Sequence, residues 1–549
     1  MRGPAFDWRR GGAVAIGVAW AMLALPAARQ LPSTDAGERF YRAGLDAGGA
    51  AVTAVVQGDI RVRSSEMPCV NCHRRSGFGT SEGPVTTPPV VGSALFAPLT
   101  RGSAQMGTVT TTGPGTRPAY TAQSLLRAVR DGVDPAGRTL SATMPRYALS
   151  GETGAALTAY LGSLAADPPA GVTADTVHLA TITTPGVSAA RRASMLEVLE
   201  TYVRHKNANT RNETGRRERG PWDMARHVGK YRNWVLHAWT LQGPPGAWPA
   251  QLSDLYREQP VFAVVSGLGD EDWTPVHEFA ERVRLPVILP QLTLPPAEAS
   301  GEGFYSLYFS KGLRLEAELL AHQLQGKTPA ARVLQVSRCG TTGHSAALAL
   351  QKRSPSVDSA CVDAGTAFTG DWWAGTLAGR PDVVVLWLGP KDLGAVADGA
   401  LPGAVGTVFV SSTLLGEVTG VVPPSIAART LVLHPFVLPG EFDRHAFRAL
   451  AWMKANGLAP ADRGVATNAL FAASLVNDAL SHPRATESRE YFIERIEHMA
   501  ARSPHRSTYP TIAFGPQRRF ASAGGYVLKA PPASGGHFGK VTEWFVPSP

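Results

Sequence analysis

The stretch from Val261 to Pro290, VFAVVSGLGDEDWTPVHEFAERVRLPVILP, decides the fold class of this chain. Its first apolar run, Val261 to Ser266, has the length of a buried strand, and Pro275 to Val283 has the pattern of an amphipathic helix. A second short apolar run, Val287 to Leu289, follows. Strand, helix and strand in this order are typical of α/β folds with parallel sheets.

The same alternation continues on both sides of this stretch. On the N-terminal side we expect strands at Val177 to Thr183 and Asn233 to Trp239, and a helix at Ser188 to His205 with Met195, Val198, Leu199 and Tyr202 on one face. On the C-terminal side a second cycle predicts strands at Arg332 to Ser337, Val383 to Leu388 and Thr407 to Val410, and helices at His344 to Lys352 and Ala461 to Leu480. Two open parallel sheets and a late return of the chain predict two hinged lobes with a cleft between them.

This order and spacing resembles the type I periplasmic solute-binding proteins of the branched-chain amino acid kind. Besides the opening stretch, the resemblance rests on Gly303 to Leu324 and on Thr508 to Tyr526, TYPTIAFGPQRRFASAGGY, and it covers about residues 175–530. It implies a two-lobed α/β domain with a solute cleft. Another doubly wound α/β fold stays open as the alternative. The family residues that hold the amino and carboxylate groups of amino acids have no match here, so amino-acid binding is not carried over.

Residues at the carboxyl ends of the expected strands are the candidates for solute contact, because open α/β sheets bind ligands there. They are Ser266 with Gly267, Gln291 with Thr293, and Ser411 with Ser412. Each of them also suits an ordinary turn or helix cap. No catalytic residue stands out, since Gly340 to Gly343 lacks the lysine of a phosphate loop. We therefore expect an electron carrier or accessory subunit rather than an enzyme.

Two of the four cysteines, Cys339 and Cys361, lie at the ends of expected neighbouring strands. In an oxidising compartment they are candidates for a disulfide bond. Two buried thiols are the alternative.

The other two cysteines form the motif Cys69-Val70-Asn71-Cys72-His73, the C-x-x-C-H arrangement of c-type haem attachment. Each thiol adds to one haem vinyl group, and His73 is delivered to the iron as the proximal ligand. Half a zinc site and a thioredoxin-like pair are the alternatives, but a second Cys/His pair at zinc spacing is absent from the sequence. We expect one covalent haem c.

The sixth iron ligand is sought among the methionines that follow, Met106 and Met144. Met144 is favoured because Pro145 biases it towards an extended conformation and a loop. A methionine that fills a core gap is the alternative. His73 and Met144 together would raise the reduction potential and favour electron transfer.

The surrounding residues resemble a class I mono-haem cytochrome c. The resemblance rests on CVNCHRRSGFG at Cys69 to Gly79, on ATMPRY at Ala142 to Tyr147, and on two flanking helices at Ala36 to Gly44 and Gly151 to Leu164. It covers about residues 35–165 and implies a small all-α domain with crossed terminal helices and Met144 as distal ligand. The long Gly-, Thr- and Pro-rich connection from Val85 to Pro118 departs from the family pattern.

The N-terminus decides the compartment. Arg2, Arg9 and Arg10 precede an apolar run from Ala13 to Leu25, which is typical of a secretory signal. No clean cleavage site follows, so an uncleaved inner-membrane anchor is the alternative. The net charge of +9 is spread along the chain rather than gathered into a basic run, and we expect no nucleic-acid partner. The protein is therefore expected in the periplasm.

The length of 549 residues allows several folding units. We expect a signal or anchor at 1–30, a cytochrome c domain at 35–165, a linker at 166–174, the binding-protein-like domain at 175–530 and a tail at 531–549. The first functional hypothesis is electron transfer to a periplasmic redox protein or dehydrogenase, with the larger domain docking the partner or recognising a small molecule. The alternative is a solute-binding or sensing protein whose haem reports or modulates redox state. An oxidoreductase subunit is a third.

Overall fold

The computed structural model describes residues 34–82, 85–99, 116–219, 232–296, 303–325, 331–394, 396, 401, 405–416, 422–482, 484–531 and 538–548. They fall into two compact units. The first holds the described residues within Met1–Asn71, Phe96–Ser103 and Pro114–Ser163, and the second holds those within Cys72–Leu95 and Leu164–Pro549. Each unit is treated by itself. The expected signal segment and Met106 lie outside the described residues.

Two crossed helices hold the first unit together. Helix α1 (Thr34–Ala43) packs against α6 (Gly151–Ser163), and α5 (Ala122–Asp131) packs against α6 as well. The crossing is close at Gly37, where a Cβ atom would lie 2.2 Å from the Ala156 carbonyl oxygen. Tyr41 and Tyr160 meet beside it, with ring centroids 5.4 Å apart. The two helices match those expected from the sequence.

The first unit also contains a small antiparallel sheet, so the expectation of an all-α unit is wrong. Its order is β2 (Ile60–Arg63), β1 (Thr53–Val56) and β5 (Arg146–Tyr147). Gln57 and Gly58 between the first two strands both have positive φ, 54° and 95°. Together with Asp59 they form the three-residue loop of a hairpin, in which β1 and β2 pair antiparallel.

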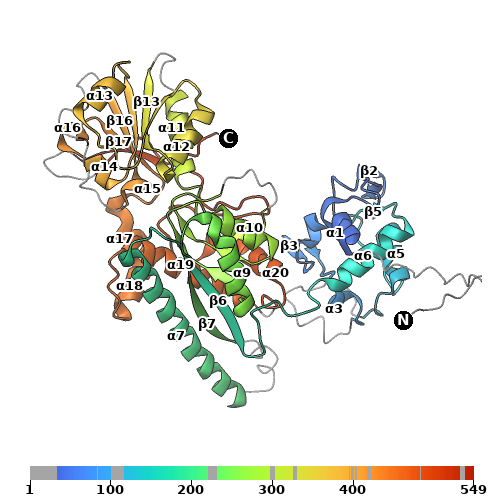
Figure 1. Ribbon diagram of the computed structural model, residues 1–549. Coiled ribbons are helices and arrows are strands. Elements are labelled where there is room, and N and C mark those ends of the chain that lie inside the picture. Colours follow the sequence, from blue (N-terminus) through green and yellow to red (C-terminus); the bar gives the residue numbers. More distant parts are fainter. Residues whose placement is uncertain are drawn as a thin grey trace, which may run out of the picture. The chain divides into compact units, whose positions relative to one another are not determined.

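The first lobe of the second unit is built on a seven-stranded parallel sheet. Its order is β11-β9-β6-β8-β10-β12, with β7 paired to β6. The strands are β6 (Thr176–Thr183), β7 (Asn233–Thr240), β8 (Ala263–Val265), β9 (Leu268–Gly269), β10 (Val287–Ile288), β11 (Gln291–Leu292) and β12 (Ser306–Leu307). Helices α9 (Trp248–Glu258) and α10 (Thr274–Arg282) cover one face, and α7 (Ala189–Arg219) lies on the other (Figure 1).

The second lobe repeats this architecture with a different sheet order, β14-β13-β15-β16-β17-β18-β19. Strand β18 pairs antiparallel with both of its neighbours, β17 and β19, and the other neighbouring strands pair in parallel. The strands are β13 (Val333–Arg338), β14 (Asp358–Val362), β15 (Val383–Trp387), β16 (Thr407–Ser411), β17 (Thr430–His434), β18 (Tyr526–Lys529) and β19 (Gly539–Lys540). The covering helices include α11 (Leu313–Gln325), α12 (Thr342–Arg353), α13 (Gly370–Thr376), α14 (Pro390–Gly394) and α16 (Pro424–Ala427).

The chain returns to the first lobe late, as the sequence predicts. After β17 it forms η3 (Pro439–Glu441), α17 (Phe442–His445) and α18 (Phe447–Ala455), and then α19 (Arg463–Leu480) and α20 (Arg489–Met499). The apolar faces of α19 and α20 complete the core beneath β6 and β8. The chain passes between the lobes after β12, after β17 and before β18. The two-lobed α/β architecture expected from the sequence is present.

Smaller elements also lie in the second unit. Strands β3 (Thr80–Glu82) and β4 (Val85–Thr87) form a hairpin, followed by α3 (Gly92–Leu95). In the second lobe a disulfide bond joins Cys339 and Cys361, whose Cα atoms lie 5.2 Å apart at the end of the neighbouring strands β13 and β14.

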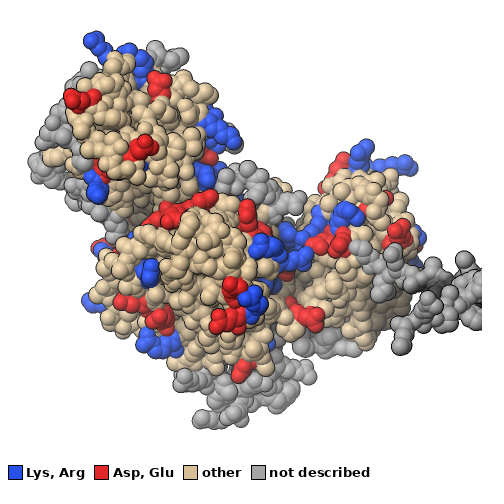
Figure 2. Space-filling view, viewed as in Figure 1, with Lys and Arg blue, Asp and Glu red and all other residues tan. Residues whose placement is uncertain are grey.

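The visible surface carries acidic and basic side chains side by side (Figure 2). In the part of the chain that the structure describes, no helix combines the length and the hydropathy needed to cross a bilayer.

Candidate functional site

A cavity of about 600 Å³ lies between the two lobes of the second unit. The first lobe contributes the loop after β9, the strand β11 and the start of α19. The second lobe contributes the short helix α15 (Ser412–Leu415) and the end of β17. These are the carboxyl ends of parallel strands and one helix start, where an open α/β sheet presents its loops to a ligand.

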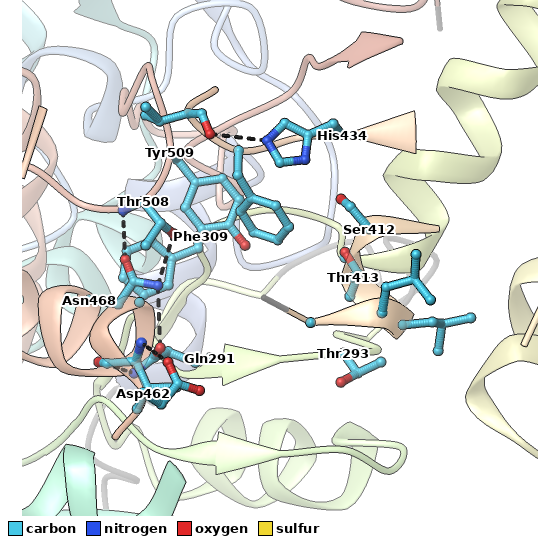
Figure 3. Close-up of a pocket in the computed structure, with 18 of the residues that line it drawn as sticks. Gln291, Thr293, Phe309, Ser412, Thr413, His434, Asp462, Asn468, Thr508 and Tyr509 are labelled. Atoms are coloured by element: carbon cyan, nitrogen blue, oxygen red, sulfur yellow. Dashed lines mark hydrogen bonds between the residues drawn. The ribbon is translucent and has the colours of Figure 1, made fainter. Parts of the chain in front are cut away.

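Three amide and hydroxyl side chains form one wall of the cavity (Figure 3). The Asn468 amide donates to the Gln291 side-chain oxygen at 3.3 Å and to the Thr508 hydroxyl at 3.0 Å. Its own oxygen accepts the Thr508 backbone N–H at 2.8 Å. Gln291 in turn donates to the Val465 carbonyl at 3.2 Å. This network ties β11, α19 and the segment around Thr508 into one surface.

A charged cluster lies at the edge of this wall. Arg191, on α7, reaches both oxygens of Asp270 at 2.7 and 2.8 Å, and its Nε lies 3.9 Å from Asp462. Thr293 donates to Asp270 at 3.0 Å. Asp462 also caps α19, where its carboxylate accepts the Val465 N–H at 2.8 Å. The single guanidinium of Arg191 is therefore shared by two carboxylates.

Aromatic rings form one part of the apolar lining, beside several Leu and Val side chains. Phe309 and Tyr509 stack with centroids 5.3 Å apart and planes 14° apart, and Phe436 meets Tyr509 at 5.1 Å. Burial raises the pKa of Tyr509 to about 12. Its hydroxyl is thus a neutral hydrogen-bonding group at physiological pH.

The second-lobe wall is anchored from behind by a buried glutamate. Glu316, on α11, accepts the Thr413 backbone N–H at 3.0 Å and the Thr413 hydroxyl at 2.6 Å. The Ser412 hydroxyl lies 3.5 Å from the same oxygen, and Ser411 caps α15 by accepting the Leu414 N–H. Burial raises the pKa of Glu316 to about 7, against the opposing effect of these hydrogen bonds.

His434 ends β17 at the same wall. Its Nε2 donates to the Val437 carbonyl at 3.0 Å. Burial lowers the pKa of His434 to about 4, so the imidazole is neutral near pH 7.

The structure brings some of the expected solute residues to the cavity and leaves others behind it. Gln291 and Thr293 line it. Ser266 is buried within hydrogen-bonding distance of Gln291, 3.4 Å away, and Ser411 caps α15 behind the lining residue Ser412. Solute contact by any of these residues stays a prediction.

Other lining residues were missed because they come from distant segments, among them Arg191, Asp270, Phe309, Asp462, Asn468, Thr508 and Tyr509. Only Asp462 had a local signal, an N-cap residue directly before a long helical pattern. Nothing local distinguishes Asn468 from the other polar residues of α19, such as Thr467 and Ser474.

Cys72 and His73 are the last two residues of the short helix α2 (Val70–His73), which Cys69 directly precedes in the chain; Cys69 is half-buried and Cys72 is exposed. The His73 Nδ1 lies 3.0 Å from the Pro88 carbonyl oxygen. A carbonyl that accepts from one ring nitrogen fixes the tautomer and directs the other nitrogen to a metal, as around most metal-bound histidines. The residues present therefore fit covalent attachment of a haem with His73 as proximal ligand.

Met144 lies in a turn of the first unit directly before β5. Its N–H donates to the Ser141 carbonyl at 3.1 Å, and its own carbonyl accepts from Arg146 at 2.6 Å. This loop position suits a thioether ligand, as expected from Pro145. His73 belongs to the second unit and Met144 to the first, so each is described only in its own surroundings.

The segment after His73 is fastened to α20. The Ser76 N–H and hydroxyl donate to Glu494 at 2.9 and 2.6 Å, and Arg74 pairs with Glu497 at 2.9 Å. The Phe78 ring lies 4.9 Å from that of Tyr491. Residues 74–78 are thus part of the packed surface of the second unit.

Within the described ranges, no group of three or more His, Cys, Asp or Glu side chains is placed to hold a metal ion. A haem iron takes only two protein ligands, so a group of three such side chains is not required for it. The expected haem site therefore stays a prediction.

Comparison with known proteins gives a fold and no family. No family model matches the chain, and no curated protein matches it. A branched-chain amino acid ABC transporter protein from Thermus thermophilus, solved with bound valine, is similar at 14% identity and a TM-score of 0.50, over 68% of this chain and 97% of that one. The substrate-binding protein of an ABC transporter from Aeropyrum pernix is similar at 12% identity and a TM-score of 0.50, over the same shares. The two-lobed α/β fold expected for residues 175–530 is thereby confirmed.

Proposed function

We propose that this chain is an exported solute-binding or sensing protein that takes a small molecule between the lobes of its second unit. The observation that carries the proposal is the cavity of about 600 Å³ lined from both lobes. This volume is within the usual range of small-molecule sites, and its lining combines aromatic rings with a few oriented polar groups, as such sites usually do.

The connections between the lobes suit this function. Three chain crossings join two lobes that have separate apolar cores. A solute that touches both linings would favour a closed arrangement, which is hinge closure around a ligand. The two similar structures are named for ABC transporters, and such a transporter is the membrane partner class that we propose.

We further propose that Cys69, Cys72 and His73 hold one haem c, with Met144 as distal ligand. The proposal is supported by the position of the two cysteines directly before His73 and by the Pro88 carbonyl beside the His73 ring. A haem with His and Met ligands supplies one-electron transfer at a raised potential. The residues of this chain would anchor it and orient the proximal imidazole. Electron transfer to a periplasmic redox protein or dehydrogenase is accordingly the second candidate function.

A solute screen on the full chain tests the first proposal. The protein, expressed with haem-maturation machinery, is unfolded thermally in the presence of small organic solutes. A solute that binds the native state raises Tm by mass action. We expect Asn468→Ala to weaken binding of such a solute by about tenfold, because the wall loses the three hydrogen bonds that join Asn468 to Gln291 and Thr508.

A matched control separates binding from general loss of stability. Asn207 holds the Trp234 N–H and carbonyl at 2.7 and 2.8 Å, and it is outside the cavity lining. Asn207→Ala should therefore lower stability and leave solute affinity unchanged. Stabilisation that is equal in wild type and Asn468→Ala, or no stabilising solute at all, would contradict cleft binding.

A further inference from the structure

The charged groups that line the cavity already have partners within the chain. Arg191 is held by both oxygens of Asp270, and Asp462 caps α19. A second cation of the lining, Arg463, pairs with Asp443 at 2.5 Å. Among the described residues, the lining therefore holds two cations and two anions, and a charged solute would find no counter-ion there that is not already engaged.

The donors of the second-lobe wall are engaged as well. A helix start commonly receives a ligand carboxylate, because its N–H groups point outward. Here the Thr413 N–H and hydroxyl both donate to the buried carboxyl of Glu316, at 3.0 and 2.6 Å. Glu316 thus occupies, from inside the protein, the Thr413 N–H and hydroxyl donors that an anionic solute would need.

The remaining lining is neutral, and its apolar part combines aromatic rings with aliphatic side chains such as Leu292 and Val432. Phe309, Phe436 and Tyr509 offer ring faces and edges. Neutral hydroxyl groups of Thr293 and Ser412 lie among the other lining residues. Such a surface suits a flat apolar body with one or two neutral hydrogen-bonding groups. Desolvating a charge there without a counter-ion would cost more free energy than these contacts would contribute.

We infer that the cleft selects an uncharged aromatic solute that carries a hydroxyl, carbonyl or amide group, and that it discriminates against carboxylates and ammonium ions. This inference rests on the proposed solute-binding function, because it assigns the solute class of the same cavity.

A matched set of phenyl compounds tests the inference on the full chain by calorimetric titration. The set is 2-phenylethanol, 2-phenylacetamide, phenylacetate, 2-phenylethylammonium and L-phenylalanine. We expect the two neutral compounds to bind at least about tenfold more tightly than each of the charged or zwitterionic ones, a difference that corresponds to about 1.4 kcal/mol.

A variant at Asp270 provides a second test, in which binding of one charged compound is expected to improve. Asp270→Asn should leave Arg191 with only its 3.9 Å contact to Asp462, and it should improve phenylacetate binding by about tenfold without improving binding of 2-phenylethanol. Asp254→Asn is the control, because Asp254 pairs with Arg257 on the exposed side of α9. It removes the same charge and should change neither affinity.

The outcomes separate the inference from the function on which it rests. Tighter binding of phenylacetate, 2-phenylethylammonium or phenylalanine would overturn the selection of neutral solutes and leave cleft binding standing. Absence of binding by all five compounds would overturn the aromatic class. The function itself would fall only if the wider solute screen also gave no ligand sensitive to Asn468→Ala.

Discussion

Replacing Glu316 by glutamine should remove a pH dependence from the stability of this protein. Burial raises the pKa of Glu316 from 4.5 to about 7 in the folded chain. Between these values the folded state keeps a proton that the unfolded state has lost. The stabilising contribution is therefore fully present below about pH 4.5, and it is lost as the pH rises through 7.

The size of the effect follows from the two pKa values. A difference of one in pKa between the folded and unfolded states corresponds to about 1.4 kcal/mol. The contribution of Glu316 to the free energy of unfolding therefore falls by about 2.5 kcal/mol between pH 5 and pH 8. In Glu316→Gln the side-chain amide would keep an oxygen for the Thr413 N–H and hydroxyl but would not titrate. The free energy of unfolding of the variant should accordingly fall by about 2.5 kcal/mol less than that of the wild type over this range.

Urea unfolding at several pH values between 5 and 8 measures this difference. Glu318→Gln is the control, because Glu318 lies on the same helix and pairs at the surface with Lys311 and Arg353. The control should follow the wild-type pH profile. If Glu316→Gln also follows it, Glu316 is ionised in the folded protein throughout, and the reasoning from burial is refuted.

Three further predictions concern the first unit and the haem motif. Gly37→Val should destabilise the first unit by about 3 kcal/mol or more in chemical denaturation, because a Cβ there meets the Ala156 carbonyl. A variant as stable as the wild type would disprove the close helix crossing. Replacing Cys69 and Cys72 together by Ala should abolish covalent haem, as read by intact mass, and retained covalent haem would exclude the proposed attachment. Met144→Ala should remove the weak long-wavelength Met-to-iron absorption band, and an unchanged spectrum would assign the sixth ligand elsewhere.

Much of the fold could be predicted because the local periodicity of apolar residues indicates where its helices and longer strands lie. The apolar run around Val383 and the helical pattern after Ala461 appear in the structure as β15 and α19, within a few residues of the expected ends. Strand β8 is shorter than the apolar run that predicted it, Ala263–Val265 against Val261–Ser266. The sheet of the first unit was missed because its strands are only two to four residues long. Such runs are too short to show a period.

The candidate site could be predicted only in part, for a related reason. Gln291 follows the strand expected at Val287 to Leu289, so sheet topology alone places it at the cavity edge. Asn468 and Thr508 join it through contacts that span 177 and 40 residues of sequence separation. No single-sequence pattern reports such pairings. Glu316 was missed because a glutamate on an amphipathic helix usually faces solvent, and its burial depends on the turn at Thr413.

Hydrogen–deuterium exchange of the full chain, with and without a stabilising solute from the screen, tests the central claim most directly. If the solute binds between the lobes, exchange should slow at the backbone amides of 291–293 in the first lobe, of 412–416 in the second, and of 508–509 beside them. Slowed exchange confined to one lobe, or to amides outside the cavity lining, would contradict a solute-binding cleft in this protein.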